Sequence, residues 1–145
     1  MSKTLEEGAS YVVGFMFNPA ENAVLLIRKR RPLWQEGKLN GIGGRIEEGE
    51  TPEGAMRREC VEEVGIDCDT WNHFCVLSDA RNWRIHFLSA VGPIMAASKM
   101  TDEEPEVVSA FALPFDVVPN LKWLIPMALS MRFERISSFN VSEIA

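Results

Sequence analysis

A helix over residues 52–64 is the feature that most constrains the fold of this chain. Thr51 can cap its first turn, Pro52 suits the first helical position, and Gly65 supplies the left-handed residue that often ends a helix. The helix also carries an apolar stripe at i, i+4 and i+8, formed by Met56, Cys60 and Val64. Because such a stripe is normally buried, we predict that the helix packs against a sheet.

The same helix has an acidic face beside this stripe. Glu59, Glu62 and Glu63 stand at i, i+3 and i+4, so their carboxylates project together. Like charges at this spacing destabilise a helix by about 0.2–0.5 kcal/mol per pair, and a bound cation would turn that repulsion into coordination. Clustered carboxylate oxygens suit hard ions such as Mg²⁺ or Mn²⁺. The alternative is a solvated helix face whose charge Arg57 and Arg58 balance.

The pattern around this helix predicts further strands and a second helix. Residues 11–17 and 23–27 are apolar runs separated by turn residues, so we expect a hairpin. The glycine-rich segment 31–44 is typical of a loop, with a short strand near Ile42. Further expected elements are strands over 74–77, 83–91 and 107–113, and a helix over 121–133 that Pro126 can kink. This mixed order predicts an α/β sandwich built on a mixed sheet.

Length and composition exclude several classes of protein. A chain of 145 residues and 16.3 kDa buries one sizeable core, which predicts a single domain over residues 1–145. Its apolar runs are far shorter than the roughly 20 residues of a membrane span. Residues 1–10 lack the basic start and apolar stretch of a secretory signal, so we expect a cytoplasmic protein without a membrane partner. Three cysteines at irregular spacing predict reduced thiols.

The charge of the chain indicates what kind of partner it binds. A formal net charge of -6 disfavours a stable nucleic-acid partner, because such binding draws on clustered basic residues. The basic run over residues 28–31 can hold phosphates, although solvated surface is the stronger explanation for it. The carboxylate face of the helix predicts a phosphate ester, bound together with a metal ion, as the partner.

Residues 44–66 resemble the signature of the Nudix hydrolase family. That pattern asks for Gly, five residues, Glu, seven residues, and then Arg-Glu-aliphatic-any-Glu-Glu-any-Gly-aliphatic. The tract beginning at Gly44 and ending at Ile66 fills every fixed position. The one departure is Cys60 at an aliphatic position, where a buried cysteine behaves as a small hydrophobe. The resemblance implies the α/β/α sandwich of the family around a mixed sheet.

The resemblance also implies roles for individual residues. Glu59, Glu62 and Glu63 would bind Mg²⁺ or Mn²⁺, supported by Glu50 and by the backbone of Gly44. Arg58 would orient the glutamates, with an ordinary helix salt bridge as the alternative. The implied reaction is metal-assisted attack of water on one phosphorus of a pyrophosphate, helped by a general base. Glu63 and Glu106 are the two candidates for that base, and for Glu106 a solvated acidic loop is an equal alternative.

A second resemblance concerns the substrate. Residues 38–44 are similar to the MutT-like branch, which hydrolyses nucleoside triphosphates, including oxidised ones, to a monophosphate and pyrophosphate. This implies that Gly43 and Gly44 lie beside the substrate and that Asn40 contacts the base. Trp123 would stack near the base, with a core aromatic as an equal alternative. The purine-sanitising enzymes carry a Trp and two acidic residues where this chain has residues 118–121, so an amide such as Asn120 would read the base here.

Two other functions stay open at this point. One is a Nudix hydrolase of another nucleoside diphosphate derivative, and the other is a nucleotide sensor that does not cut its ligand. The full acidic set of the helix argues against a pure sensor, which has no need for a metal site. A homodimer is compatible with the family, and nothing in the sequence locates an interface.

Overall fold

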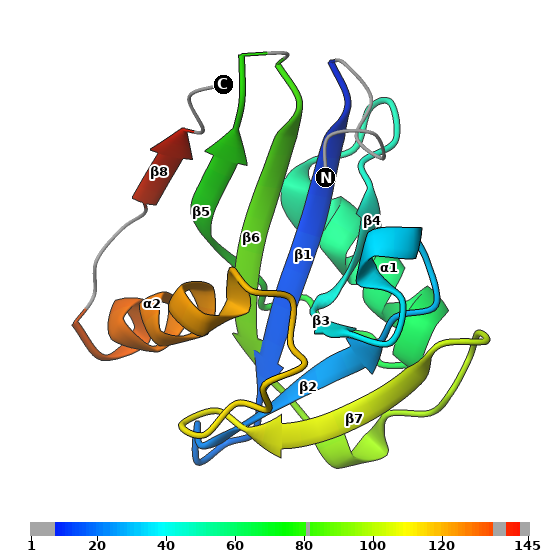
Figure 1. The fold of residues 1–145 in the computed structure, drawn as a ribbon, viewed down its shortest axis with the longest axis vertical. Coiled ribbons are helices and arrows are strands. Elements are labelled where there is room, and N and C mark those ends of the chain that lie inside the picture. Colours follow the sequence, from blue (N-terminus) through cyan, green and yellow to red (C-terminus); the bar gives the residue numbers. More distant parts are fainter. Residues whose placement is uncertain (1–7, 81, 135–138, 143–145) are drawn as a thin grey trace.

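The computed structural model describes residues 8–80, 82–134 and 139–142. They form eight strands, two α-helices and two short 3-10 turns (Figure 1). The strands are β1 Ser10–Phe17, β2 Ala23–Arg28, β3 Leu39–Asn40, β4 Ile42–Arg45, β5 Asn72–Ser78, β6 Arg84–Val91, β7 Glu104–Ser109 and β8 Phe139–Ser142. The helices are α1 Pro52–Val64 and α2 Leu121–Glu134, and the 3-10 turns are η2 Leu33–Gln35 and η3 Ile94–Ala96.

All eight strands belong to one mixed sheet. Its main path runs β3-β2-β1-β6-β5-β8, with β4 paired to β1 and β7 paired to β2. Strand β1 lies parallel to β6, whereas β2 and β4 are both antiparallel to β1. The two antiparallel partners share one edge of β1, since β4 pairs with residues 11–14 and β2 with residues 16–17. The sheet therefore branches at β1, and the branch places the glycine-rich strand β4 beside α1.

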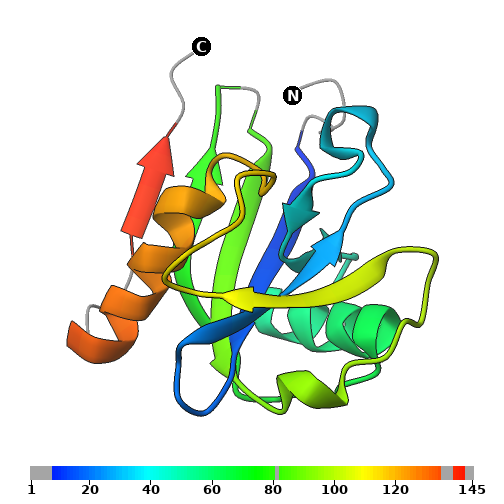
Figure 2. The same cartoon turned by 60° about the horizontal axis from the view of Figure 1, so that its bottom comes forward.

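The two helices cover opposite faces of this sheet (Figures 1 and 2). On one face, the stripe of α1 packs with Val12 and Met16 of β1 in an apolar cluster. On the other face, Phe15 and Phe17 of the same strand pack with α2. Because successive side chains of β1 point to opposite faces of the sheet, this strand contributes residues to both clusters. The α/β/α sandwich around a mixed sheet is confirmed.

Most of the predicted elements are confirmed with small shifts at their ends. The first hairpin pairs Met16 with Leu25 and Phe17 with Val24. Helix α1 has the predicted bounds, and α2 extends one residue beyond the predicted end, with Pro126 inside it. The apolar stripe of α1 is fully buried. The three cysteines are free thiols and all are buried.

The strand predicted over 107–113 is wrong at both ends. Strand β7 begins at Glu104 and ends at Ser109, because it pairs with β2 along its whole length, from Arg28 to Ala23. Beyond Ser109 there is no β2 residue left to pair with, and Phe111 is 70% exposed. Turn η2 and strand β3, which lie inside the predicted loop, were also not predicted.

No helix within the described residues is long and apolar enough to cross a membrane. The inference about a secretory signal concerns residues 1–10, of which residues 1–7 lie outside the described residues.

Candidate active site

Local sequence signals place the acidic face of α1. The side chain of Thr51 accepts a hydrogen bond from the backbone N–H of Gly54 at 3.0 Å and so caps the helix. Gly65 ends it in the left-handed region, with φ of 74°. Because the apolar stripe is buried, the neighbouring Glu59 and Glu63 lie at the edge of the core and are partly buried. Glu62 points outward, and its side chain is 57% exposed.

Two glycines of β4 bring the strand against these carboxylates. The backbone N–H of Gly43 donates to Oε2 of Glu63 at 2.9 Å. A Cβ atom at Gly44 would collide with the carboxylate of Glu59, and one at Gly43 would collide with the backbone carbonyl of Val12. At position 43 only glycine therefore fits beside β1, whereas at position 44 a side chain would displace the carboxylate of Glu59.

Burial penalises the charged forms of the two inner carboxylates. It raises the pKa of Glu63 to about 8, although nearby Lys29 opposes the shift. Burial also raises the pKa of Glu59 above its ordinary value, against the hydrogen bond from Arg58. These two groups therefore gain more from a nearby positive charge than exposed glutamates would.

Arg58 connects the carboxylates of this region. Its Nε and Nη2 atoms each donate to Glu50 at 2.8 Å, and Nη1 donates to Glu59 at 2.9 Å and to Glu62 at 3.4 Å. Nη2 also donates to the backbone carbonyl of Arg45 at 3.0 Å. The hydrogen bonds from Arg58 lower the pKa of Glu50 to about 2. These contacts agree with the orienting role that the resemblance implies for Arg58.

The donor set at α1 fits a divalent cation. The carboxylates of α1 lie beside strand β4. Because residue 44 of this strand is glycine, the carboxylate of Glu59 can occupy the space that a side chain at position 44 would fill. The elevated pKa values of Glu59 and Glu63 show a site that disfavours uncompensated negative charge. In the described part of the chain, no three His, Cys, Asp or Glu side chains are already arranged to hold a metal ion. Coordination would thus require the glutamates to turn from Arg58 toward the ion.

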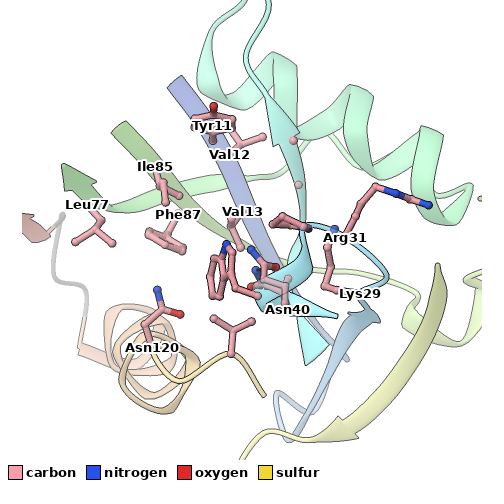
Figure 3. A pocket seen from close by; sticks show the side chains of 17 residues that line it. Tyr11, Val12, Val13, Lys29, Arg31, Asn40, Leu77, Ile85, Phe87 and Asn120 are labelled. Carbon is pink, nitrogen blue, oxygen red and sulfur yellow. Dashed lines mark hydrogen bonds between the residues drawn. The ribbon is translucent and has the colours of Figure 1, made fainter. Parts of the chain in front are cut away.

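A pocket of about 410 Å³ adjoins the same two glycines. In Figure 3, Val13, Ile85 and Phe87 of the sheet lie on one side of the pocket. The side chain of Asn120, the residue just before α2, points toward it. The pocket is thus on the α2 face of the sheet, whereas the glutamates are on α1. Gly43 and Gly44 line the pocket and also contact Glu63 and Glu59. Strand β4 is the boundary that the two halves of the site share.

The structure brings both predicted base-reading amides into this pocket. Asn40 donates through Nδ2 to Oε1 of Gln35 at 2.9 Å, and its Oδ1 accepts from the backbone N–H of Gly41 at 2.8 Å. Oδ1 of Asn120 is buried and has no hydrogen-bond partner among the described residues. A buried acceptor without a partner is costly, which favours a ligand that donates a hydrogen bond there.

Two predicted site residues lie elsewhere. Trp123 is 40% exposed and is not among the described residues that line the pocket. Successive helical residues turn by about 100°, so Trp123 lies on the face of α2 opposite buried Leu121 and Ile125. Glu106 accepts from Nε and Nη2 of Arg28 at 2.7 and 2.8 Å, and this pairing lowers its pKa. Its carboxylate is thus held by Arg28 and not by the acidic face of α1.

Sequence reasoning missed residues of turn η2 and of the loop after η3. Trp34 and Gln35 line the pocket, and an aromatic residue within a Pro- and Gly-containing loop was the only signal for them. Glu103 is 5% exposed and accepts from the backbone N–H of Arg30 at 2.7 Å and from Nζ of Lys29 at 3.0 Å. It anchors the start of the loop that carries η2.

Comparison with protein families shows that residues 9–130 match the model of the NUDIX domain. The oxidized purine nucleoside triphosphate hydrolase of Mus musculus is 29% identical over 115 residues, covering 75% of this chain and 73% of that protein. The enzyme of the same name from Danio rerio is 51% identical over 47 residues, which are 32% of this chain and 30% of that protein. The 8-oxo-dGTP diphosphatase of Escherichia coli K12 is 44% identical over 62 residues, 43% of this chain and 45% of that protein.

Solved structures show the same fold. A MutT chain from a study of Aliivibrio salmonicida and Vibrio cholerae has a TM-score of 0.65 at 22% identity, covering 83% of this chain and 98% of that chain. A NUDIX hydrolase from Nitrosomonas europaea has a TM-score of 0.68 at 17% identity, covering 97% of this chain and 81% of that chain. At these identities the likeness establishes the fold alone.

Proposed function

The chain belongs to the Nudix family, and from this premise we propose that it hydrolyses nucleoside triphosphates to a monophosphate and pyrophosphate. The observation that carries the proposal is the shared boundary at Gly43 and Gly44, where a pocket meets partly buried glutamates. A base held in the pocket would place its phosphates toward the acidic face of α1. The distant similarity to hydrolases of oxidised purine nucleoside triphosphates supports this substrate class.

In this proposal Glu59, Glu62 and Glu63 hold Mg²⁺ or Mn²⁺, supported by Glu50. The cation, when bound, supplies Lewis-acid polarisation of a phosphoryl oxygen and offsets the charge of the phosphates. In the metal-free site Arg58 gathers Glu50, Glu59 and Glu62 beside one another through its five hydrogen bonds to these acids and to the carbonyl of Arg45, and Glu59 and Glu62 would turn from it toward the ion.

Glu63 is the best candidate for the proton acceptor. Its Oε2 atom is held by the N–H of Gly43, which leaves Oε1 to take a proton from the attacking water. Glu106, held by Arg28, would first have to leave an ion pair.

A substrate panel tests the proposal. The protein is incubated with Mg²⁺ and dGTP, 8-oxo-dGTP, dATP, dCTP, dTTP, ADP-ribose and a dinucleoside polyphosphate, and the products are resolved by ion-exchange chromatography. We expect a nucleoside monophosphate and pyrophosphate from at least one triphosphate. Turnover of ADP-ribose or the dinucleoside polyphosphate alone would replace the proposal with hydrolysis of another diphosphate derivative. Tight nucleotide binding without turnover of any compound would indicate a sensor.

A further inference from the structure

Turn η2 supplies two side chains to the pocket wall. Trp34 and Gln35 both line the pocket. Trp34 also packs against the apolar cluster that Phe15 and Phe17 of β1 form with α2. Leu33, in the same turn, is 84% exposed. The turn therefore presents an aromatic face and an amide to the pocket while its first residue faces solvent.

The loop that carries η2 is held at both ends. At its start, the backbone N–H groups of Arg30 and Arg31 donate to Glu103 at 2.7 and 3.4 Å. At its end, the N–H of Gly37 donates to the carbonyl of Lys29 at 2.8 Å. These contacts hold both ends of the loop, so Trp34 and Gln35 are presented on an anchored segment.

Gln35 limits how the amide of Asn40 can lie. Oε1 of Gln35 accepts from Nδ2 of Asn40 at 2.9 Å, and the N–H of Gly41 donates to Oδ1 of Asn40 at 2.8 Å. Turning the Asn40 amide over would set Nδ2 against the N–H of Gly41 and Oδ1 against Oε1 of Gln35. The bond from the Gly41 N–H would then be lost, whereas Gln35 could keep its bond by turning its own amide. The N–H of Gly41 therefore selects the orientation of the Asn40 amide, and Gln35 fixes the position of its outer end.

The pocket wall carries three amides together with the basic side chains of Lys29 and Arg31. The described lining residues include the amides of Gln35, Asn40 and Asn120 and contain no Asp or Glu. Asn40 keeps one N–H group for a ligand acceptor, and the buried Oδ1 of Asn120 is without a partner among the described residues, ready for a ligand donor. Selectivity thus depends on which way each amide is turned.

We propose that Gln35 is a positioning residue that sets base selectivity by fixing the position of the Asn40 amide, while Trp34 packs on the face of the base. The inference rests on the proposed function for its substrate class, a nucleotide. Packing on an aromatic face is tolerant of base identity. Trp34 therefore supplies affinity and the Gln35–Asn40 pair supplies discrimination.

A double-mutant cycle on nucleotide binding tests the role of Gln35. Dissociation constants of dGMP, dAMP, dCMP and TMP are measured by calorimetry for the wild type, Gln35→Met, Asn40→Ala and the double variant. In the wild-type background, Gln35→Met should reduce the ratio between the dissociation constants of the weakest and the strongest ligand at least fivefold. In the Asn40→Ala background, the same substitution should reduce this ratio less than twofold. An equal loss in both backgrounds, which a merely structural role would give, overturns the proposal, as does no loss in either.

A second pair of variants tests Trp34. Trp34→Leu should weaken all four monophosphates by at least fivefold and leave their order unchanged, whereas the matched control Leu33→Ala should bind them as the wild type does. A changed order in Trp34→Leu, or an equal effect in Leu33→Ala, contradicts the assignment. Absence of binding of all four ligands to the wild type also overturns the inference.

These binding measurements need no hydrolysis. If the wild type binds monophosphates selectively but turns over no triphosphate, the proposed function fails while the role of Gln35 stands. If triphosphates are hydrolysed but the cycle shows no coupling, the inference alone fails.

Discussion

The carboxylate of Glu63 on α1 accepts a hydrogen bond from the backbone N–H of Gly43 on β4 at 2.9 Å. Gly43 also lines the pocket on the α2 face of the sheet. A single peptide group thus joins the partly buried acid to the wall of the ligand pocket. The distance between a bound base and the carboxylates is therefore set by the backbone of β4.

Alanine at the two β4 glycines should have different effects. At Gly44 a Cβ would meet only the end of the Glu59 side chain, which can move, so Gly44→Ala should fold normally and lose at least tenfold in kcat. At Gly43 the Cβ would meet the backbone carbonyl of Val12, which is fixed in the sheet. Gly43→Ala should lower the free energy of unfolding by about 2 kcal/mol or more. Urea unfolding and steady-state kinetics of both variants check this, and equal stability of the two would contradict it.

Glu63→Gln should separate catalysis from stability. The substitution removes the proposed proton acceptor and a metal-binding carboxylate, so kcat should fall by a factor on the order of 10² to 10⁴. The fold should not suffer, because a neutral amide in this position avoids the cost of burying a charge. A variant with wild-type kcat would exclude the catalytic role of Glu63.

The same variant should change how stability depends on pH. Burial raises the pKa of Glu63 from 4.5 to about 8, so the native state binds a proton more tightly than the unfolded state. The contribution of Glu63 is therefore fully present below pH 4.5 and is lost as the pH rises through about 8. Without added metal, Glu63→Gln should be the more stable protein at pH 9, by roughly 1 kcal/mol or more. Urea unfolding at pH 5 and pH 9 measures this, and a variant that is less stable at pH 9 would refute it.

Arg58→Lys should show that the forked guanidinium is needed. Arg58 donates through Nε, Nη1 and Nη2 to Glu50, Glu59 and the carbonyl of Arg45, and a lysine cannot reproduce that geometry. We expect kcat to fall at least tenfold. The matched control is Arg57→Lys, because Arg57 contacts Asp67 on the surface and no acid of the cluster. Equal kinetics for the two variants would argue against a positioning role for Arg58.

A histidine pair away from the pocket should make the fold sensitive to mild acid. Nε2 of His73 and Nδ1 of His86 lie 2.8 Å apart. Burial lowers the pKa of both imidazoles below the ordinary value of 6.5, and for His86 the neighbouring His73 adds to the effect. The unfolded chain then binds protons more readily, so the free energy of unfolding should decrease as the pH falls below 6.5. In urea unfolding at pH 7.5 and 5.5, His86→Gln should show a smaller decrease, and an unchanged one would contradict this explanation.

Features with local causes were predictable from the sequence. Helix α1 begins and ends where Thr51, Pro52 and Gly65 place it, because capping and the left-handed stop act within one turn. Its acidic and apolar faces follow from residue spacing alone. The shared face of the three glutamates was therefore predictable, whereas the nearness of Gly44 to them was implied only by the resemblance to the family.

Features that depend on distant partners were not predictable in this way. The bounds of β7 follow from pairing with β2, and its polar residues Glu104 and Glu106 do not resemble a strand pattern. Turn η2 reaches the pocket because Glu103, more than seventy residues later, anchors the loop before it. Trp123, which a resemblance placed near the base, is 40% exposed and does not line the described pocket.

Metal binding by α1 is the most direct test of the account. Mn²⁺ is titrated into the protein and followed by electron paramagnetic resonance, and Mg²⁺ is titrated by calorimetry, with and without dGMP. The account predicts saturable binding that weakens at least tenfold in Glu59→Gln and Glu63→Gln. It should be unchanged in Glu53→Gln, an exposed acid of the first turn of the same helix. No appreciable affinity for either ion, or equal weakening in all three variants, would contradict it.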